Sequence, residues 1–563
     1  MAESQESHLL ALAPELTQII SDELDLASVG HLRLACKHLA ELLNSRVFRA
    51  LTIDITKNTI ERSLAKIVTL ATSDHAARQA TRDLSILSLS PAFSPEYRGP
   101  QWNHVDGQWI AEPEPQAPPE VALAEEEMKL HLFQAITSLK GVQSVHWVPR
   151  SMDNQWAHST VMDALKSLPN LREFWVSLPS IKTPVAWEHL KGLRQIHIEG
   201  TCDEHEDETF DSLAKAVAQS PQLTSIEIAS GWRYRLPTNK KQSLHQIFKY
   251  YPRDATPLRL RHLQLMTWLV RLDEVTLPHL KHLTSLELVN IEDPYARSPY
   301  TLAESDDESE AKHENRRYGS SVEEIWKTMR SARIRLEELT VDVVTPSFLD
   351  YLSSYSGLKM LHITPGGFHE GTSSDALAKK FFADPLQKHS GSLEDLNIAA
   401  RYEGLWCFSD HNLPAIAKCT NLKSLRIAII SSQLWNDDDH AKAAPNSDAI
   451  KLLIDTALVH LPHLKKFQIV AANLETLRHA RCGNPAMSHF SRAGKMMVRS
   501  VLNYTAPPSC RRLPTLKVGT GRSFRGRPIQ VFTAGSDGHD LEGGPLRYID
   551  SSPPTEGRDE FNW

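Results

Sequence analysis

The chain has 563 residues, which is too long for one ordinary compact core and predicts either several domains or an elongated repeat architecture. Hydrophobic residues make up 41 % and charged residues 23 %, with 33 prolines and 24 glycines, so collagen-like and fully disordered chains are excluded. The net charge of -7 is unevenly spread, because residues 471–536 hold 11 basic side chains and 1 acidic one.

Residues 9–48 predict three short helices. The first starts at Pro14, since proline is favourable at the first helical position, and the others cover about 28–34 and 36–43. A segment this short cannot bury all of its aliphatic side chains on its own. We therefore expect an apolar face that is left for a partner or for the rest of the chain.

The same segment resembles an F-box, whose pattern begins Leu-Pro-x-Glu-Leu and continues with leucine-rich helices and a Cys-Lys or Cys-Arg pair. The positions that match include Leu12, Glu15, Leu16, Leu32, Leu34, Cys36 and Lys37. Pro14 stands one place later than the family proline. The resemblance implies docking onto the Skp-type adaptor of a cullin-containing (SCF) ubiquitin ligase. The residues assigned to that contact are Leu12, Pro14, Leu16, Ile19, Leu24, Leu32, Leu34 and Cys36. The alternative is that the segment only caps the apolar end of the repeats that follow.

Residues 51–89 are expected to start the repeats, with strands near 48–53 and 83–89. Residues 90–127 are rich in proline and poor in aliphatics in their first part, which predicts a flexible linker. The repeats proper are placed at 128–470.

One pattern recurs eleven times between 142 and 469: aliphatic, two polar, aliphatic, one polar, aliphatic. Its first residues are Val142, Leu171, Leu193, Leu223, Leu260, Leu283, Leu336, Leu358, Leu393, Leu422 and Leu464. Turn residues precede most instances, and amphipathic helices are expected upstream at 210–219, 322–333, 348–355, 376–388 and 449–460. A unit of helix, turn and short strand predicts parallel strands with the helices on one side. One unit cannot offset its own backbone entropy, so neighbours must stack.

This pattern resembles leucine-rich repeats, and the order of the two modules is similar to fungal members of the F-box and leucine-rich-repeat family. The fold class implied is α/β: a three-helix F-box followed by an irregular leucine-rich-repeat solenoid, a curved parallel sheet with helices on its convex side. The asparagine or cysteine that usually follows the strand is replaced, for example by Trp268, Ile291 and Arg401, which predicts an irregular solenoid. An ordinary α/β domain with aliphatic strands is the alternative.

Two segments interrupt or follow the repeats. Residues 292–320 form an acidic loop, in which Ser305 stands in an acidic context that suits acidophilic kinases, although a plain solvated loop is the simpler interpretation. Residues 471–563, basic and then acidic, are expected to be a largely disordered tail. Its aromatics are few, so nucleic acid is not the expected partner.

A client protein is expected on the concave face, because alternate strand residues point away from the helices. Acidic side chains dominate the earlier positions, which favours a client of basic character anchored near Trp175. The residues assigned to client binding are Trp175, His197, Glu227, Glu287, Glu338, His362, Asn397 and Arg426. Simply solvated strand residues are the alternative.

No catalytic motif, metal-ligand spacing or cofactor fingerprint is present in the sequence, so we expect a binding protein rather than an enzyme. The sites examined and set aside were the glycines of 519–526, the pair His279 and His282, and the acidic cluster 202–208. The six cysteines are interpreted as buried thiols of a reducing compartment. No signal peptide or membrane span is expected, which places the chain in the cytoplasm, the nucleus or both.

The function that these features predict is the substrate-recognition subunit of an SCF-type ligase, linked through its adaptor to a cullin. The alternatives are a leucine-rich-repeat scaffold that has no connection with ubiquitination, and an enzyme with an unrecognised site. A receptor whose repeat pocket holds a small molecule is a further variant.

Overall fold

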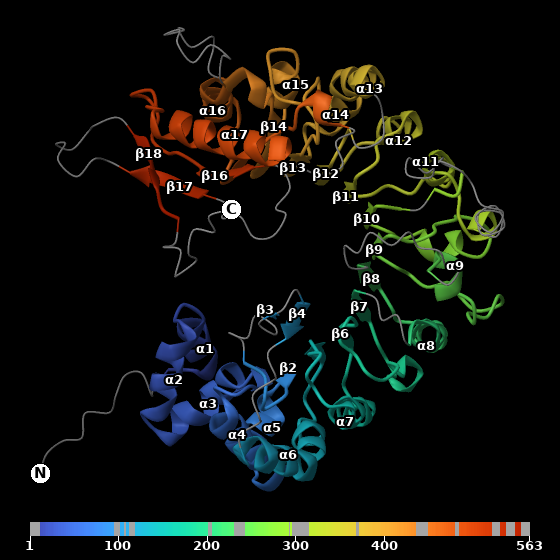
Figure 1. Ribbon diagram of the computed structural model, residues 1–563, viewed down its shortest axis with the longest axis vertical. Helices are drawn as coiled ribbons and strands as arrows, with labels where there is room; N and C mark the ends of the chain where they lie inside the picture. Colours follow the sequence, from blue (N-terminus) through green and yellow to red (C-terminus); the bar gives the residue numbers. More distant parts are fainter. Residues whose placement is uncertain are drawn as a thin grey trace, which may run out of the picture. The chain divides into compact units, whose positions relative to one another are not determined.

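The computed structural model describes residues 12–94, 102–105, 108–111, 119–200, 205–229, 242–291, 293–295, 315–366, 371–434, 449–478, 484–520, 530–535 and 546–552 (Figure 1). The chain divides into two compact units. The first comprises Met1–Leu260 with Asp273–Leu280, and the second Arg261–Leu272 with Lys281–Trp563.

The first unit begins with three helices and continues with alternating strands and helices. Its helices are α1 (Pro14–Asp22), α2 (Leu26–Leu34), α3 (Lys37–Val47), α4 (Ile60–Thr72), α5 (Ala77–Ala80), α6 (Pro119–Ser138), α7 (Gln155–Lys166), η1 (Trp187–His189), α8 (Glu206–Ala218), α9 (Leu244–Ile247) and η2 (Leu277–Leu280). Its main sheet has the order β1 (Ala50–Ile55), β2 (Asp83–Leu89), β5 (Ser144–Trp147), β6 (Glu173–Ser177), β7 (Gln195–Glu199), β8 (Ser225–Ala229), with parallel pairing between all of these neighbours. Strands β3 (Trp102–Val105) and β4 (Gln108–Ala111) form a separate antiparallel pair.

The second unit repeats the same plan. Its strands follow one another as β9 (His262–Met266), β10 (Ser285–Val289), β11 (Glu338–Val341), β12 (Met360–Ile363), β13 (Asp395–Ile398), β14 (Ser424–Ile429), β15 (Lys466–Ala471), β16 (Thr515–Thr520), β17 (Gln530–Gly535) and β18 (Arg547–Asp550). Its helices are α11 (Val322–Ser331), α12 (Pro346–Leu352), α13 (Gly371–Ala383), α14 (Pro385–His389), α15 (Leu413–Ala417), η3 (Ser431–Leu434), α16 (Ala449–His460), η4 (Glu475–Leu477) and α17 (Asn484–Leu502). Pairing is parallel from β9 to β16 and antiparallel from β16 to β18.

Each of the eleven pattern instances coincides with one strand, from β5 to β15, so the prediction of repeated parallel strands is confirmed. The register aligns the aliphatic positions: Phe174 pairs with Val145 and Ile196, and Leu361 pairs with Leu339 and Leu396. These side chains are buried, and each contributes about 1.5–3 kcal/mol on burial. The expected strands near 48–53 and 83–89 are also present, as β1 and β2.

Local sequence signals set several helix ends. Thr345 Oγ1 accepts a hydrogen bond from the Phe348 amide at 3.3 Å, with Pro346 at the first helical position of α12. Ser321 and Glu324 form the expected capping box of α11. The single helix expected at 376–388 is two helices, because Pro385 cannot donate the hydrogen bond that would continue α13.

The prediction of a largely disordered tail beyond 471 is wrong for the residues that the structure describes there. Strand β16 pairs in parallel with β15, and Leu513, Leu516 and Val518 form a twelfth instance of the strand pattern. Helix α17 buries Met497 and Val501, and β17 and β18 close the sheet with antiparallel pairs. The tail therefore supplies the last repeat and its cover, so that the apolar end of the sheet is shielded.

The flexible linker expected at 90–127 is also partly wrong. Helix α6 begins at Pro119, since a proline at the first helical position costs no hydrogen bond. The helix buries Val121 and Ala124. Residues 102–105 and 108–111 pair as β3 and β4. Of the acidic loop 292–320, the structure describes residues 293–295 and 315–320. Ser305 lies outside the described residues.

Candidate functional site

The three N-terminal helices form a small module with its own core. Val29, Leu39 and Leu43 are buried together, and Leu32 and Cys36 pack against them. Asp25 caps α2 by accepting from the Ser28 amide at 2.8 Å. Arg46 of α3 ties α1 to this core, since its guanidinium contacts Asp22 at 2.7 Å and donates to the Leu24 carbonyl at 2.9 Å.

Helix α1 is oriented with its polar side inward. The residues that it buries are Thr17 and Ser21, which are 2 % and 1 % exposed. Leu16 and Ile19 on its other side are 48 % and 60 % exposed. Arg46 stabilises this orientation by donating to Ser21 Oγ at 3.1 Å. A helix that places its large apolar side chains in water has the orientation expected of a docking element.

The exposed apolar side chains of α1, of α2 and of the turn between them make up what we call the apolar face. Its members are Leu16, Ile19, Ile20, Leu24, Leu26 and Leu34. Four of them, Leu16, Ile19, Leu24 and Leu34, were among the residues assigned to adaptor binding, and Leu34 is the most exposed at 74 %.

The other assigned adaptor residues behave differently. Pro14 is exposed and Leu12 is partly buried, whereas Leu32 and Cys36 face the module core. Sequence reasoning missed Leu26 as a member of the apolar face, because it lies at the start of α2 just before the expected helix. Ile20 was placed at helical spacing with Leu16 but was not assigned to the contact.

In the first unit, four side chains assigned or adjacent to the client site occupy one register row on the face of the sheet opposite the helices. The register aligns His146, Trp175, His197 and Glu227. Trp175 lies between two imidazoles, with ring centroids 3.8 Å from His146 and 5.3 Å from His197. His197 Nδ1 lies 2.6 Å from Glu227 Oε2. Burial, followed by the nearby His197, lowers the pKa of His146.

In the second unit, the equivalent row changes sign along the sheet. The register aligns Gln264, Glu287, Thr340, His362, Asn397, Arg426, Gln468 and Lys517. His362 Nε2 lies 3.1 Å from Asp395 Oδ1. Burial lowers the pKa of the Arg426 guanidinium.

Seven of the eight residues assigned to client binding therefore fall in these two rows. Glu338 is the exception, since it aligns with Ser285 and Met360, two residues before the row. Lys517 was missed because it lies on β16, in the segment expected to be disordered.

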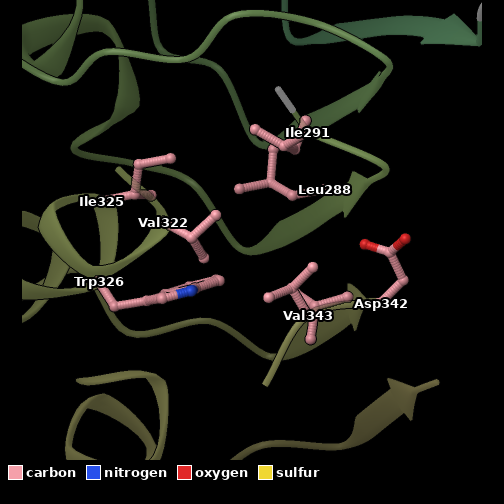
Figure 2. A pocket seen from close by; sticks show the side chains of 8 residues that line it. Leu288, Ile291, Val322, Ile325, Trp326, Asp342 and Val343 are labelled. Carbon is pink, nitrogen blue, oxygen red and sulfur yellow. The ribbon is translucent and has the colours of Figure 1, made fainter. Parts of the chain in front are cut away.

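Two hollows are found among the described residues of the second unit. The first, of about 10 Å³, lies between α11 and strands β10 and β11, and Figure 2 shows Leu288, Val322, Ile325 and Trp326 around it. That volume is at the lower limit for a single water molecule. The second, of about 390 Å³, is lined by Lys359, Gly391, Ser392, Glu394, Asn421, Lys423 and His463. Neither gives specific support to a receptor that holds a small molecule.

Of the remaining sequence candidates, His279 has a structural role, and residues 202–204 and 521–526 lie outside the described residues. His279 accepts a hydrogen bond from the Leu258 amide at 3.0 Å and stacks on Phe248, and burial lowers its pKa to about 4. Burial raises the pKa of the Cys407 thiol to about 12, but Cys36 and Cys510 are only partly buried, so the prediction of buried thiols is wrong for these two. Within the described residues no group of three or more His, Cys, Asp or Glu side chains is arranged to hold a metal ion. The described helices include none with the length and apolar character that a membrane crossing requires.

No family model matches the sequence. No curated protein matches it either. Among solved structures, the Rad7 and Elc1 complex in yeast contains a chain that is similar to this one, with 12 % identity and a TM-score of 0.34. The alignment covers 82 % of this chain and 87 % of that chain.

Proposed function

We propose that the chain is an F-box protein with leucine-rich repeats that acts as the substrate-recognition subunit of an SCF-type cullin ubiquitin ligase. The observation that carries the proposal is the orientation of α1, which buries Thr17 and Ser21 and exposes Leu16 and Ile19. A helix that serves only as a cap on the repeats would turn these large side chains toward the chain itself.

The apolar face has the character of an obligate docking surface. Burying one leucine or isoleucine side chain contributes about 1.5–3 kcal/mol, so leaving six large ones exposed costs the isolated chain much solvation free energy. A second polypeptide with an apolar groove recovers that free energy on binding. In the proposed function this polypeptide is the Skp-type adaptor, which links the chain to a cullin.

The client is proposed to bind the face of the sheet opposite the helices. Glu227 lies in the row of the first unit and Glu287 in the row of the second, where Glu338 is found on β11 two residues before the row. These carboxylates favour a client of basic character by charge complementarity, which sets encounter rate and specificity. The imidazoles on either side hold the Trp175 ring in place, so it offers a rigid contact surface.

The test is binding of a purified Skp-type adaptor to the full chain and to its L16S/I19S/L34S variant. The matched control is L123S/L130S, which removes two leucines of α6 that are each 68 % exposed and lie outside the apolar face. We expect at least a hundredfold loss of adaptor affinity in the first variant, because three buried contacts of about 1.5–3 kcal/mol are removed, and no change in the control.

Two results would contradict the proposal. Equal adaptor binding by both variants would show that the apolar face is not the contact. Failure of the unaltered chain to bind any Skp-type adaptor would favour the second candidate, a repeat scaffold outside ubiquitination. Circular dichroism of each variant checks that the loss does not arise from unfolding.

A further inference from the structure

The residue immediately before each strand of the first unit belongs to a continuous row, which we call the strand-start row. Backbone hydrogen bonds connect its members: Arg172 N donates to the Gln143 carbonyl at 2.8 Å, Arg194 N to the Arg172 carbonyl at 2.6 Å and Thr224 N to the Arg194 carbonyl at 2.9 Å. The row continues on the other side through Arg82 and Arg49. Four of its six positions are therefore arginine, and none is acidic.

Arg172 and Arg194 are exposed and have no ion pair among the described residues. Lys140 and Lys191, also exposed, lie in the turns that lead into β5 and β7. The turn before β5 neighbours the turn before β6, since Asn170 Nδ2 donates to the Lys140 carbonyl at 2.8 Å. The row and the turns that lead into it thus present four cations that are available to a partner.

The other two arginines of the row are engaged. Arg82 donates to the carbonyls of Gln79 at 2.6 Å and Gly141 at 3.3 Å. Arg49 lies 3.4 Å from Asp83, with both side chains largely in solvent. Arg82 and Arg49 stabilise the turns and add to the positive potential of the row, but their guanidinium groups are already engaged and are not counted as binding residues.

A row of like charges on adjacent strands is destabilising, so it does not serve the fold. In the second unit, four of the six charged residues at the same positions form ion pairs with each other. There the row reads Arg261, Thr284, Glu337, Lys359, Glu394, Lys423 and Lys465, linked by the same backbone hydrogen bonds. Glu337 pairs with Lys359 at 2.7 Å, and Glu394 pairs with Lys423 at 2.6 Å. The backbone of this repeat can therefore hold ion pairs at the strand-start positions, but the first unit has arginines there without acidic partners in the row.

We propose that Lys140, Arg172, Lys191 and Arg194 bind an extended acidic peptide that crosses the starts of strands β5 to β7. Neighbouring strands lie about 4.8 Å apart, while carboxylates on one side of an extended peptide recur about every 6.8 Å, a mismatch that flexible arginine and lysine side chains bridge. Arginine also receives carboxylates and phosphates by two parallel hydrogen bonds. The peptide is a partner additional to the adaptor and the client of the proposed function.

Nucleic acid fits this row less well than a peptide. Sequence-independent duplex binding uses about 6–10 phosphate contacts, and the row offers four free cations. Single strands need aromatic side chains for stacking, and the turns 139–143, 168–172 and 190–194 contain none. Glu173 at the start of β6 and Glu199 at the end of β7 repel a polyanion broad enough to cover both the turns and the strands.

The experiment measures fluorescence anisotropy of a labelled ten-residue glutamate peptide with the full chain, its R172S/R194S variant and the control K57S/R253S. Lys57 and Arg253 are exposed cations of the first unit outside the row, so both variants lose the same charge. We expect R172S/R194S to weaken binding about tenfold, because each lost contact contributes up to about 1 kcal/mol, and the control to change it less than twofold.

A glutamine peptide of the same length and a short DNA duplex complete the experiment. Support requires that the glutamine peptide does not bind and that the duplex binds more weakly than the glutamate peptide. Equal loss of glutamate binding in both variants would overturn the assignment to the row, and tighter duplex binding that R172S/R194S abolishes would overturn the choice of a peptide. Adaptor binding is measured on the same variant, and because the apolar face is intact there, its outcome bears on the proposed function alone.

Discussion

At the position just before each strand, the first unit carries arginines without acidic neighbours in the row, whereas the second alternates glutamate and lysine in ion pairs. Equivalent buried histidines differ in a similar way. In the first unit His279 accepts from the Leu258 amide at 3.0 Å, and in the second His389 accepts from the Leu358 amide at 3.2 Å while its other nitrogen lies 3.0 Å from the Leu352 carbonyl. The comparison shows that the backbone of the repeat does not determine which polar residues occupy these positions. They can form ion pairs that stabilise the fold or remain available for binding.

We expect acidic pH to produce the largest difference in stability between the two units. Burial lowers the pKa of His279 to about 4, whereas the ordinary value for the unfolded chain is 6.5. Because the unfolded chain takes up the proton first, stability is complete above pH 6.5 and is lost as the pH falls toward 4, by up to about 3 kcal/mol. We expect H279Q to remove most of this slope, measured as the pH dependence of the urea midpoint.

The histidine of the second unit provides the control for this measurement. Burial also lowers the pKa of His389, but its hydrogen bond to the Leu352 carbonyl favours the charged form and opposes that shift. H389Q should therefore change the acid slope less than H279Q does. An unchanged slope in H279Q would mean that other groups govern the acid sensitivity of the first unit.

The acidic residues of the open sheet face should bind cations, in contrast to the strand-start row of the first unit. We expect E227K/E287K/E338K to weaken binding of a ten-residue lysine peptide more than tenfold, because reversal adds repulsion to the lost attraction. Anisotropy measures the affinity. E41K/D74K/D254K makes the same change of charge at exposed positions elsewhere, and equal losses in the two variants would assign the effect to net charge alone.

Periodicity was sufficient to predict the strands, because the two aliphatic positions of each strand are two residues apart and must therefore share the buried side of the sheet. The same pattern occurs at Leu513, Leu516 and Val518, but the prediction ended the repeats at 470 and expected a largely disordered tail beyond them. The contact of β16 with β15 depends on long-range pairing, which composition does not reveal.

The candidate surfaces were only partly predictable. Spacing groups Leu16, Ile19 and Ile20 on one side of a helix, yet it does not decide whether that side faces the protein or the solvent. Burial of Thr17 and the contacts of Arg46 settle the orientation, and these depend on the packing of α1 against α3. Likewise, Arg172 and Arg194 are separated in sequence, and only the register makes them neighbours.

Converting the first unit toward the second tests whether its charges are retained for binding. R172E places an acid beside Arg194, as Glu337 stands beside Lys359. We expect the affinity for the glutamate peptide to fall about tenfold, and the free energy of unfolding to stay constant or rise by about 0.2–1 kcal/mol, as for an exposed pair. Urea denaturation measures the second quantity. A marked loss of stability would indicate that Arg172 is a structural residue.

The reverse conversion should have the smallest effect. E337Q/E394Q removes the acids that pair with Lys359 and Lys423 and leaves these lysines as free cations in the second unit. Exposed pairs contribute about 0.2–1 kcal/mol each, so we expect a small drop in the urea midpoint and about a threefold gain in affinity for the glutamate peptide. D74N/D254N loses the same two charges without breaking a pair in the described structure, so it controls for the overall field. If both variants gain affinity equally, the position of the charges is irrelevant, and the contrast between the units has no bearing on binding. If only E337Q/E394Q gains affinity, ion pairing is what keeps the second unit from attracting acidic peptides.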